Sequence, residues 1–163
     1  EDGIGELFAR GPNIMKGYLD DEQANRDVFV DGWFNTGDLA RIDEDGYIFL
    51  TGRKKNVIVL KNGKNIYPEE IEALIDKLPY VTENVVMGEE DGDDYRLVAY
   101  VVYDPEAEEL KDKSADEIQS VVDADIEKIS DEMPKYKRIK QTYLRTEEFE
   151  KTTTQKIKRR KVK

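Results

Sequence analysis

The spacing of apolar residues changes along this chain of 163 residues and separates a strand-rich first third from a mixed remainder. In the first third, "GELFARG", "DGWFNTGDLARI" and "DEDGYIFLTGR" are short apolar stretches bounded by turn residues, a pattern typical of strands. Asp31-Gly32 and Asp45-Gly46 fall where tight turns would join such strands. We therefore expect a small β-meander at the start of the chain.

A hairpin and two helices are predicted after this meander. Asn62-Gly63 separates two short apolar runs and suits the positive φ angles of a hairpin turn. Pro68 then opens a stretch of helical apolar spacing that we expect to end at Leu78. Ser114 and Glu117 form a capping-box signature before a second amphipathic stretch, which reaches Pro134.

Strands are predicted between and after the helices. They are "NVVMG" and "YRLVAYVVY", separated by the acidic solvated turn "EEDGDD", and a last strand at residues 141–144. Strands and helices therefore interleave, which predicts an α+β fold. We expect a small domain with a central sheet flanked by helices and a β-hairpin, preceded by β-rich strands.

Charge is divided unevenly along the chain. The formal net charge is −11, but seven of the 26 basic residues lie in residues 151–163, which hold no acidic residue. The preceding 150 residues thus carry 19 basic against 37 acidic side chains, or −18. An acidic body with one short basic end argues against nucleic acid as a partner, because phosphate backbones require a broad positive surface.

Composition removes several kinds of chemistry. The chain has no cysteine and no histidine, so disulfides, thiolate metal sites and histidine bases are excluded, and no metal site is expected. No apolar run is long enough to span a membrane, and the start "EDGIGELF" is too acidic for a signal peptide. We expect a soluble, cytoplasmic chain. Because it begins without methionine and almost within a strand, we expect it to be a piece of a larger protein.

Several short motifs occur in a fixed order and carry a family resemblance. They are Gly5-Glu6-Leu7 with Gly17-Tyr18, Thr36-Gly37-Asp38, Gly52-Arg53, Pro68 to Glu72, and Lys151-Thr152 followed by Lys156. In this order they resemble the closing motifs of the AMP-forming acyl-CoA synthetase superfamily, which includes luciferases and the adenylation domains of peptide synthetases. The sequence "GRKKNVIVLKNGKNIYPEEIE" looks most like that of bacterial long-chain fatty acid–CoA ligases.

The resemblance implies a two-part organisation. Residues 1–53 would be the end of a large N-terminal domain, and residues 54–163 would be the mobile C-terminal domain. The full-length enzyme would use ATP, Mg²⁺ and CoA to convert a carboxylate, for example a fatty acid, to acyl-AMP and then to acyl-CoA. The magnesium ligand and the acyl pocket would lie in the missing part, so this chain alone is expected to be inactive.

The resemblance also implies roles for residues that form part of the nucleotide site. Lys156 matches the catalytic lysine that touches the substrate carboxylate and the ATP phosphates. Gln155 replaces the glycine that usually precedes this lysine, so the loop would adopt a positive φ less freely. Asp38 matches the aspartate that binds the ribose hydroxyls, and Arg53 matches an arginine near the ribose and phosphates. Taken alone, Lys156 is a solvated cation, Asp38 is a turn cap and Arg53 is a surface cation.

Two further segments have roles implied by the resemblance. Lys55 occupies the hinge position about which the small domain swings, although many relatives have aspartate there. Gly63 would let the hairpin loop line the CoA tunnel, and Lys61 or Lys64 would contact CoA phosphates. A plain hairpin turn is the alternative explanation for the two lysines.

Three alternatives to a long-chain fatty acid–CoA ligase stay open. The chain could belong to a peptide-synthetase adenylation domain or to a luciferase-like enzyme, since the acyl group is selected elsewhere. It could also be a non-catalytic module whose basic tail meets an anionic partner, although the tail lacks aromatic residues for base stacking. A peripheral membrane contact is compatible with the sequence.

Overall fold

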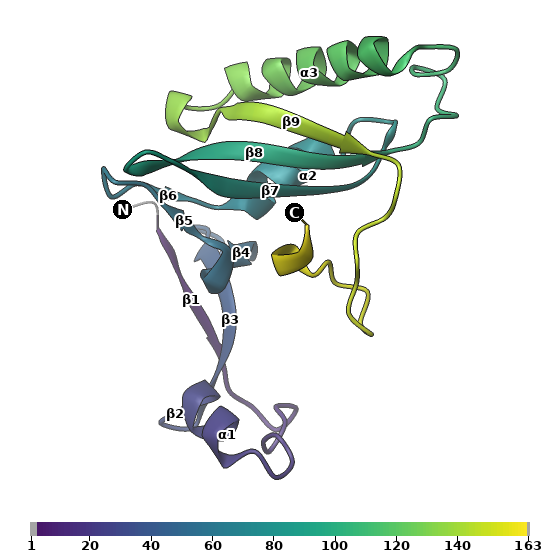
Figure 1. Ribbon diagram of the computed structural model, residues 1–163. Coiled ribbons are helices and arrows are strands. Elements are labelled where there is room, and N and C mark those ends of the chain that lie inside the picture. The colour runs from purple at the N-terminus through teal and green to yellow at the C-terminus, as the bar shows by residue number, and fades with distance from the viewer. Residues whose placement is uncertain (1–2, 163) are drawn as a thin grey trace. The chain divides into compact units, whose positions relative to one another are not determined.

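The computed structural model describes residues 3–162, which fold as two compact units, Glu1–Val57 and Ile58–Lys163 (Figure 1). Lys163, the last residue of the basic tail, lies outside the described residues. We predicted a boundary after Arg53, and the assignment of residues 1–53 to a larger domain stays a prediction.

The first unit is an antiparallel sheet built around one long central strand. Its elements are β1 (Ile4–Ala9), α1 (Glu22–Val28), β2 (Phe29–Val30), β3 (Trp33–Ile42) and β4 (Ile48–Arg53). Strands β1, β2 and β4 all pair with β3. Asp31 and Gly32 both have positive φ in the tight turn between β2 and β3, as a two-residue hairpin turn requires. The predicted meander is thus present.

The first unit also contains a helix that the sequence pattern does not predict. Helix α1 buries none of its residues, so no apolar periodicity marks it. Its N-cap is Asp21, whose carboxylate accepts a hydrogen bond from the Ala24 N–H at 2.9 Å. Asn25 ties it to the preceding loop through hydrogen bonds with both the N–H and the carbonyl of Tyr18.

The second unit is a three-stranded sheet with helices on one face. Its elements are β5 (Ile58–Val59), β6 (Asn65–Ile66), α2 (Pro68–Ile75), β7 (Val81–Asp91), β8 (Asp94–Tyr103), α3 (Ala115–Asp131) and β9 (Ile139–Arg145). Strand β8 is central, antiparallel to β7 and parallel to β9. The α+β class, with a sheet flanked by helices and a hairpin and preceded by β-rich strands, is confirmed.

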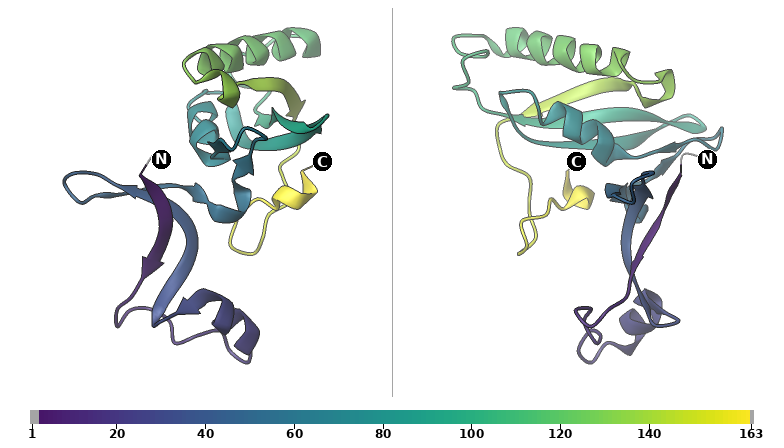
Figure 2. Two further views of the ribbon diagram at one scale, coloured as in Figure 1. Left: turned by 90° about the vertical axis from the view of Figure 1, so that its left-hand side faces the viewer. Right: turned by 180° about the vertical axis from the view of Figure 1, so that it is seen from behind.

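Alternate residues of the sheet face two different layers. Val86, Ala99 and Val101 pack with α2 and α3 in the main core, which includes Ile71 and Val122. Val85 and Val102 point to the opposite face, where Phe149 and Val162 of the C-terminal segment cover them. Figure 2 shows the helices on one side of the sheet and the C-terminal segment on the other. The C-terminal segment, as far as Val162, is therefore part of the fold.

The acidic stretch "EEDGDD" contains the exposed turn that we expected, but the turn is shorter and covers only residues 92–93. Strands β7 and β8 continue through it, with Glu89 opposite Arg96 and Asp91 opposite Asp94, and only Gly92 has a positive φ there. Arg96 forms an ion pair with Glu89, at 3.0 Å, across the ladder, and such cross-strand pairs stabilise a hairpin. The charged positions therefore belong to a long hairpin.

Both helices end earlier than predicted. Helix α2 ends at Ile75, and the N–H of Leu78 then donates to the Ile75 carbonyl in a following turn. Leu78 still packs against the main core, which explains its place in the apolar pattern. Helix α3 ends at Asp131, short of Pro134, and its Ser114–Glu117 capping box is confirmed. Among residues 3–162, no helix is long and apolar enough to cross a membrane.

Candidate functional site

Asp38 and Arg53 form a pair on neighbouring strands of the first unit. They are direct partners in the β3–β4 ladder, and Arg53 Nη1 lies 2.5 Å from Asp38 Oδ1. Arg53 Nη1 also donates to the Thr36 carbonyl at 3.2 Å. The exposed fractions of the two side chains are 39% for Arg53 and 27% for Asp38, so a carboxylate and a guanidinium remain within reach of a ligand.

An irregularity in β3, where its register against β1 shifts, holds this pair in place. Thr36 donates its hydroxyl to the Leu7 carbonyl at 2.9 Å and accepts the Asp38 N–H at 3.0 Å. Gly37 follows with φ +71°, a conformation that residues with side chains rarely adopt. The Thr-Gly-Asp motif therefore aims the Asp38 carboxylate through its backbone geometry.

Lys55 lies in a short 3₁₀ turn, Lys54–Asn56, directly after β4. Its neighbour Lys54 forms an ion pair with Glu6 of β1 at 2.5 Å. Hydrogen bonds from Lys54 and Asn35 hold the pKa of the Glu6 carboxyl below its ordinary value. The residue before Lys55 is thus held to β1 by an ion pair, while Lys55 itself is exposed.

The predicted hairpin is present, with a turn that differs in detail from the expectation. Gly63 has φ +78°, whereas Asn62 has no positive φ, and the Gly63 N–H donates to the Leu60 carbonyl at 2.8 Å. No heavy atom lies within 4 Å of where a Gly63 Cβ would be. Lys61 pairs with Asp93 at 2.9 Å, and the Lys64 ammonium lies 4.4 Å from the centre of the Tyr136 ring.

Lys156 ends a tight loop near the C-terminus. The Thr152 N–H donates to the Lys156 carbonyl at 2.8 Å, and the Lys156 N–H donates to the Thr152 hydroxyl at 3.2 Å. Gln155 has φ +60°, so the loop adopts the left-handed conformation even without the expected glycine. A pairing between Lys151 and Ile157 closes the base of the loop.

Lys156 differs from most cations around it. Within the part of the chain that the structure describes, it is exposed and forms no ion pair, and the same holds for Arg160. The other cations of residues 151–162 all pair with carboxylates: Lys151 with Glu83 and Glu148, Lys158 and Lys161 with Glu150, and Arg159 with Glu69 and Glu72. The basic tail is therefore mostly neutralised, which leaves Lys156 available to a ligand.

Sequence reasoning missed the pair between Arg159 and Glu72. Arg159 Nη2 lies 2.5 Å from Glu72 Oε2, and its Nη1 donates to the Val86 carbonyl at 3.0 Å. Burial raises the pKa of the Glu72 carboxyl above its ordinary value, although the hydrogen bond from Arg159 opposes that shift. Glu72 belongs to a motif that we identified, but no local pattern indicates its partner 87 residues away.

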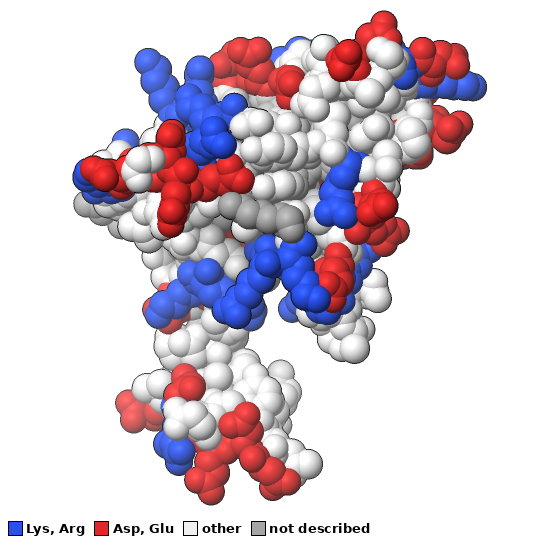
Figure 3. Space-filling model, in the orientation of Figure 1, with Lys and Arg blue, Asp and Glu red and all other residues white. Residues whose placement is uncertain are grey.

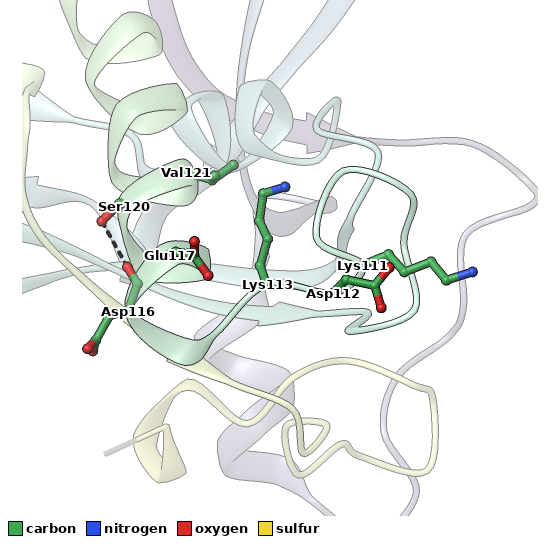
Figure 4. A pocket seen from close by; sticks show the side chains of 7 residues that line it. All are labelled: Lys111, Asp112, Lys113, Asp116, Glu117, Ser120 and Val121. Carbon is green, nitrogen blue, oxygen red and sulfur yellow. Dashed lines mark hydrogen bonds between the residues drawn. The ribbon is translucent and has the colours of Figure 1, made fainter.

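Two surface features lie apart from these residues. Acidic side chains gather over α3 on the face drawn in Figure 3. Figure 4 shows an open hollow beside the start of α3, where the Ser120 hydroxyl donates to the Asp116 carbonyl. None of the predicted site residues lines this hollow. In residues 3–162 no group of carboxylates is arranged to hold a metal ion.

The predicted residues thus fall into three groups. Asp38 and Arg53 are in contact in the first unit, whereas Gly63 with its two lysines and the Lys156 loop belong to the second unit. An unpaired ammonium on a closed loop suits an anionic ligand, and a carboxylate beside a guanidinium suits a polar ligand with hydroxyls.

Comparisons with known proteins identify relatives of both units. A family model described as AMP-binding enzyme C-terminal domain matches residues 55–163. The chain is 38% identical over 160 residues to the 2-succinylbenzoate–CoA ligase of Listeria monocytogenes, covering 98% of this chain and 31% of that protein. It is 44% identical over 103 residues to a long-chain-fatty-acid–CoA ligase of Mycobacterium tuberculosis, covering 63% of this chain and 17% of that protein.

A solved structure has the same arrangement of elements. The O-succinylbenzoate coenzyme A synthetase of Bacillus subtilis, in complex with ATP and magnesium ion, matches with a TM-score of 0.76 and 31% identity. The match covers 98% of this chain and 30% of that chain. The chain therefore spans less than a third of the length of these three relatives.

Proposed function

Because this chain belongs to the AMP-binding enzyme C-terminal domain family, we propose that it is the C-terminal portion of an ATP-dependent acyl-CoA synthetase. The full-length enzyme would join a carboxylate to AMP, release pyrophosphate, and then transfer the acyl group to CoA. The observation that carries the proposal is Lys156, an exposed ammonium on a closed loop that forms no ion pair within residues 3–162, whereas most cations around it in that range are paired with carboxylates.

Lys156 would act in the adenylation step. A carboxylate and a polyphosphate repel each other, and the transition state spreads negative charge over several oxygens. A compact ammonium on a long, unpaired side chain can contact both groups at once. The same residue has no evident task in the later attack of the CoA thiol, so its removal should affect one half-reaction only.

Asp38 and Arg53 would bind the nucleotide. Asp38 would accept hydrogen bonds from the ribose hydroxyls through Oδ2, since its Oδ1 already accepts from Arg53. Arg53 keeps a 39% exposed side chain next to that site and would face the ribose and phosphates. Their contact in the β3–β4 ladder supports a shared role.

Lys55 would be the hinge between the two half-reactions. It follows the last strand of the first unit, and the division between the two compact units comes two residues later, after Val57. Hinges are commonly short segments at the ends of elements, where φ and ψ can change. The Glu6–Lys54 pair would hold the chain on the first-unit side of the swing.

The hairpin loop would meet CoA after the swing. The space around Gly63 leaves room for the pantetheine arm to approach the backbone. Lys61 and Lys64 would contact CoA phosphates, although Lys61 would first have to leave Asp93. ATP, CoA and the acid are therefore the proposed small-molecule partners, with Mg²⁺ held by the missing portion.

The first unit supports the proposed domain assignment. Of its described residues only Ala40 and Thr51 are buried, and several large apolar side chains on β4 are exposed. Residues 1–53 would therefore complete the large N-terminal domain, with its other strands covering these side chains. A long-chain fatty acid is the proposed substrate, supported by the Mycobacterium tuberculosis relative, with 2-succinylbenzoate as the second candidate, supported by the Listeria relative.

The test is ATP-dependent acyl-CoA formation by the full-length protein with fatty acids of several lengths and with 2-succinylbenzoate. Acid-dependent ATP–pyrophosphate exchange measures adenylation, and supplied acyl-AMP measures the CoA step. Lys156→Ala should lose adenylation by about 100-fold or more and keep the CoA step. Lys55→Pro, which fixes φ at the hinge, should show the opposite pattern.

Different results would overturn different parts of the proposal. No activity with any acid would refute the synthetase assignment. Equal loss of both half-reactions in Lys156→Ala would remove the proposed role of the lysine, and unchanged CoA transfer in Lys55→Pro would remove that residue from the hinge.

A further inference from the structure

We propose that Arg159 and Glu72 are positioning residues that hold the Lys156 loop for adenylation, an inference that rests on the function proposed above. Arg159 lies three residues after Lys156 and belongs to a short 3₁₀ turn, Arg159–Lys161. Glu72 lies on α2, in a different layer of the second unit. Their contact connects the end of the chain to the centre of the fold.

Glu72 joins three parts of the second unit through one carboxylate. Its Oε1 accepts the backbone N–H of Val86 at 2.7 Å, and its Oε2 lies 2.5 Å from Arg159 Nη2. Arg159 completes the arrangement because its Nη1 donates to the carbonyl of the same residue, Val86, at 3.0 Å. The exposed fractions are 12% for the Glu72 side chain and 23% for Arg159, so water screens this pair only in part. We call these three residues the clasp.

The geometry of the clasp suits arginine and glutamate specifically. A guanidinium offers several N–H groups in a fixed fork, so it can donate to a carboxylate and to a carbonyl at the same time. The lysine ammonium has three donors around a single nitrogen, and it lacks the flat fork that fits both acceptors. The clasp therefore sets the direction of the chain at Arg159 as well as its distance from β7.

The start of the loop is anchored independently. Lys151 forms ion pairs with Glu83 of β7 and with Glu148, and the Phe149 N–H donates to Glu83 at 2.9 Å. The Phe149 side chain is buried against Val85 and Val102. The chain is thus fixed to the sheet on both sides of residues 152–156, by Glu83 before the loop and by the clasp after it.

Between these two anchors, the hydrogen bonds described for residues 152–156 all lie within the loop, and none of them joins the loop to the sheet. Residues 152–155 are exposed, as is Lys156, and the loop is closed by its own backbone hydrogen bonds. A lysine that must contact two anionic groups in a transition state needs a fixed origin, because a displacement of about 1 Å can reduce a rate by about 100-fold. The clasp supplies that fixed origin on the C-terminal side.

Arg160 provides a matched control. It is the same residue type at the next position, it is exposed, and it forms no ion pair within residues 3–162. Arg160→Met therefore removes the same charge and the same hydrogen-bond donors as Arg159→Met without touching the clasp. Arg159→Lys keeps the charge near Glu72 but replaces the fork.

The experiment measures the two half-reactions in the full-length protein for these variants and for Glu72→Gln. Arg159→Met should lower adenylation by about tenfold to 100-fold and leave the CoA step with supplied acyl-AMP unchanged. Glu72→Gln should show the same pattern, and Arg159→Lys should recover part of the adenylation rate. Arg160→Met should behave like the unmodified protein.

Hydrogen exchange on the same proteins gives a readout that does not depend on activity. The backbone N–H groups of Thr152, Gln155 and Lys156 are hydrogen bonded within the loop. They should exchange faster in Arg159→Met and not in Arg160→Met, while the strand amides of β8 stay protected in both. Loss of protection throughout β8 would mean that Arg159→Met had unfolded the domain. The test of the clasp would then be Arg159→Lys, which should keep β8 protected and recover part of the adenylation rate.

The outcomes separate this inference from the proposed function. An active enzyme in which Lys156→Ala is impaired but Arg159→Met is not would overturn the clasp and leave the synthetase assignment intact. Equal loss in both half-reactions for Arg159→Met would also overturn it, because a merely structural role predicts that result. An enzyme inactive with every acid refutes the proposed function, and the exchange rates of the loop still test the anchoring.

Discussion

The two units of this chain differ in how far their apolar side chains are buried. In the second unit, residues such as Ile71, Val101 and Val122 are fully buried between the sheet and its helices. In the first unit, Leu50 and Ile48 of β4 are 67% and 54% exposed. Fully closed cores of this kind stabilise a domain by themselves, whereas an uncovered sheet depends on something that covers it. The comparison shows a closed core in the second unit and a largely exposed sheet in the first.

The largest effect should come from truncating one apolar residue in each unit. Ile71→Ala leaves a cavity in the main core and should lower the free energy of unfolding of the second unit by about 2 to 5 kcal/mol. Leu50→Ala changes a side chain that is already in water and should alter stability by less than about 0.5 kcal/mol. Urea unfolding of this chain, followed by circular dichroism, measures both.

Repeating Leu50→Ala in the full-length protein sharpens the result. If the larger N-terminal domain proposed above covers β4, the same substitution should become clearly destabilising there. Equal costs for Ile71→Ala and Leu50→Ala in the chain itself would contradict the comparison, because they would require a closed core in both units.

A smaller effect should come from removing the helix N-caps. Each unit has a helix with a side-chain N-cap, so the two units can be compared. Ser114 caps α3 in a reciprocal box with Glu117, and Ser114→Ala should cost about 1 kcal/mol of stability in the second unit. Asp21 caps α1, which buries no residue, so Asp21→Ala should fray that helix without moving the main unfolding transition. Exchange rates of the Glu117 and Ala24 amides, together with urea unfolding, distinguish these outcomes.

The smallest effect should be a pH dependence of opposite sign in the two units. The pKa of Glu6 is lowered by hydrogen bonds from Lys54 and Asn35, so the stability it contributes is present above its ordinary pKa and is lost as pH falls through the lowered value. The pKa of Glu72 is raised by burial, so its contribution is present below the ordinary pKa and is lost as pH rises through the raised value.

Carboxyl NMR titration of Glu6 and Glu72 checks the two directions, with Glu6→Gln and Glu72→Gln identifying the signals. Unfolding of each variant as a function of pH should then show opposite trends relative to the unmodified chain. A Glu72 pKa below the ordinary value would mean that Arg159 outweighs burial, and the contrast between the two carboxyls would disappear.

Features with a local cause could be predicted from the sequence. The capping box at Ser114 and the left-handed Gly63 depend on neighbouring residues alone, and both are present. The ordered motifs correctly indicated the family, because each keeps its residue types at a fixed place along the chain. The α+β class followed from the alternation of strand and helix periods.

Features that depend on distant partners could not be predicted. The clasp joins residues 87 positions apart, and an arginine in a basic tail gives no sign of a buried carboxylate partner. The strands continue into "EEDGDD", where Glu89 pairs with Arg96 on the opposite strand, a contact that a reading of one strand at a time misses. Helix α1 was missed because polar caps, rather than an apolar face, determine it.

Gln155 limits the number of backbone conformations that the loop can adopt in the absence of a ligand. Its φ of +60° is uncommon for a residue with a side chain, whereas glycine would occupy that region freely together with many others. Glutamine makes the observed shape harder to reach but also removes many competing shapes from the ensemble. A loop with this residue samples fewer backbone conformations than one with glycine. The Lys156 ammonium is therefore confined to a narrower range of positions.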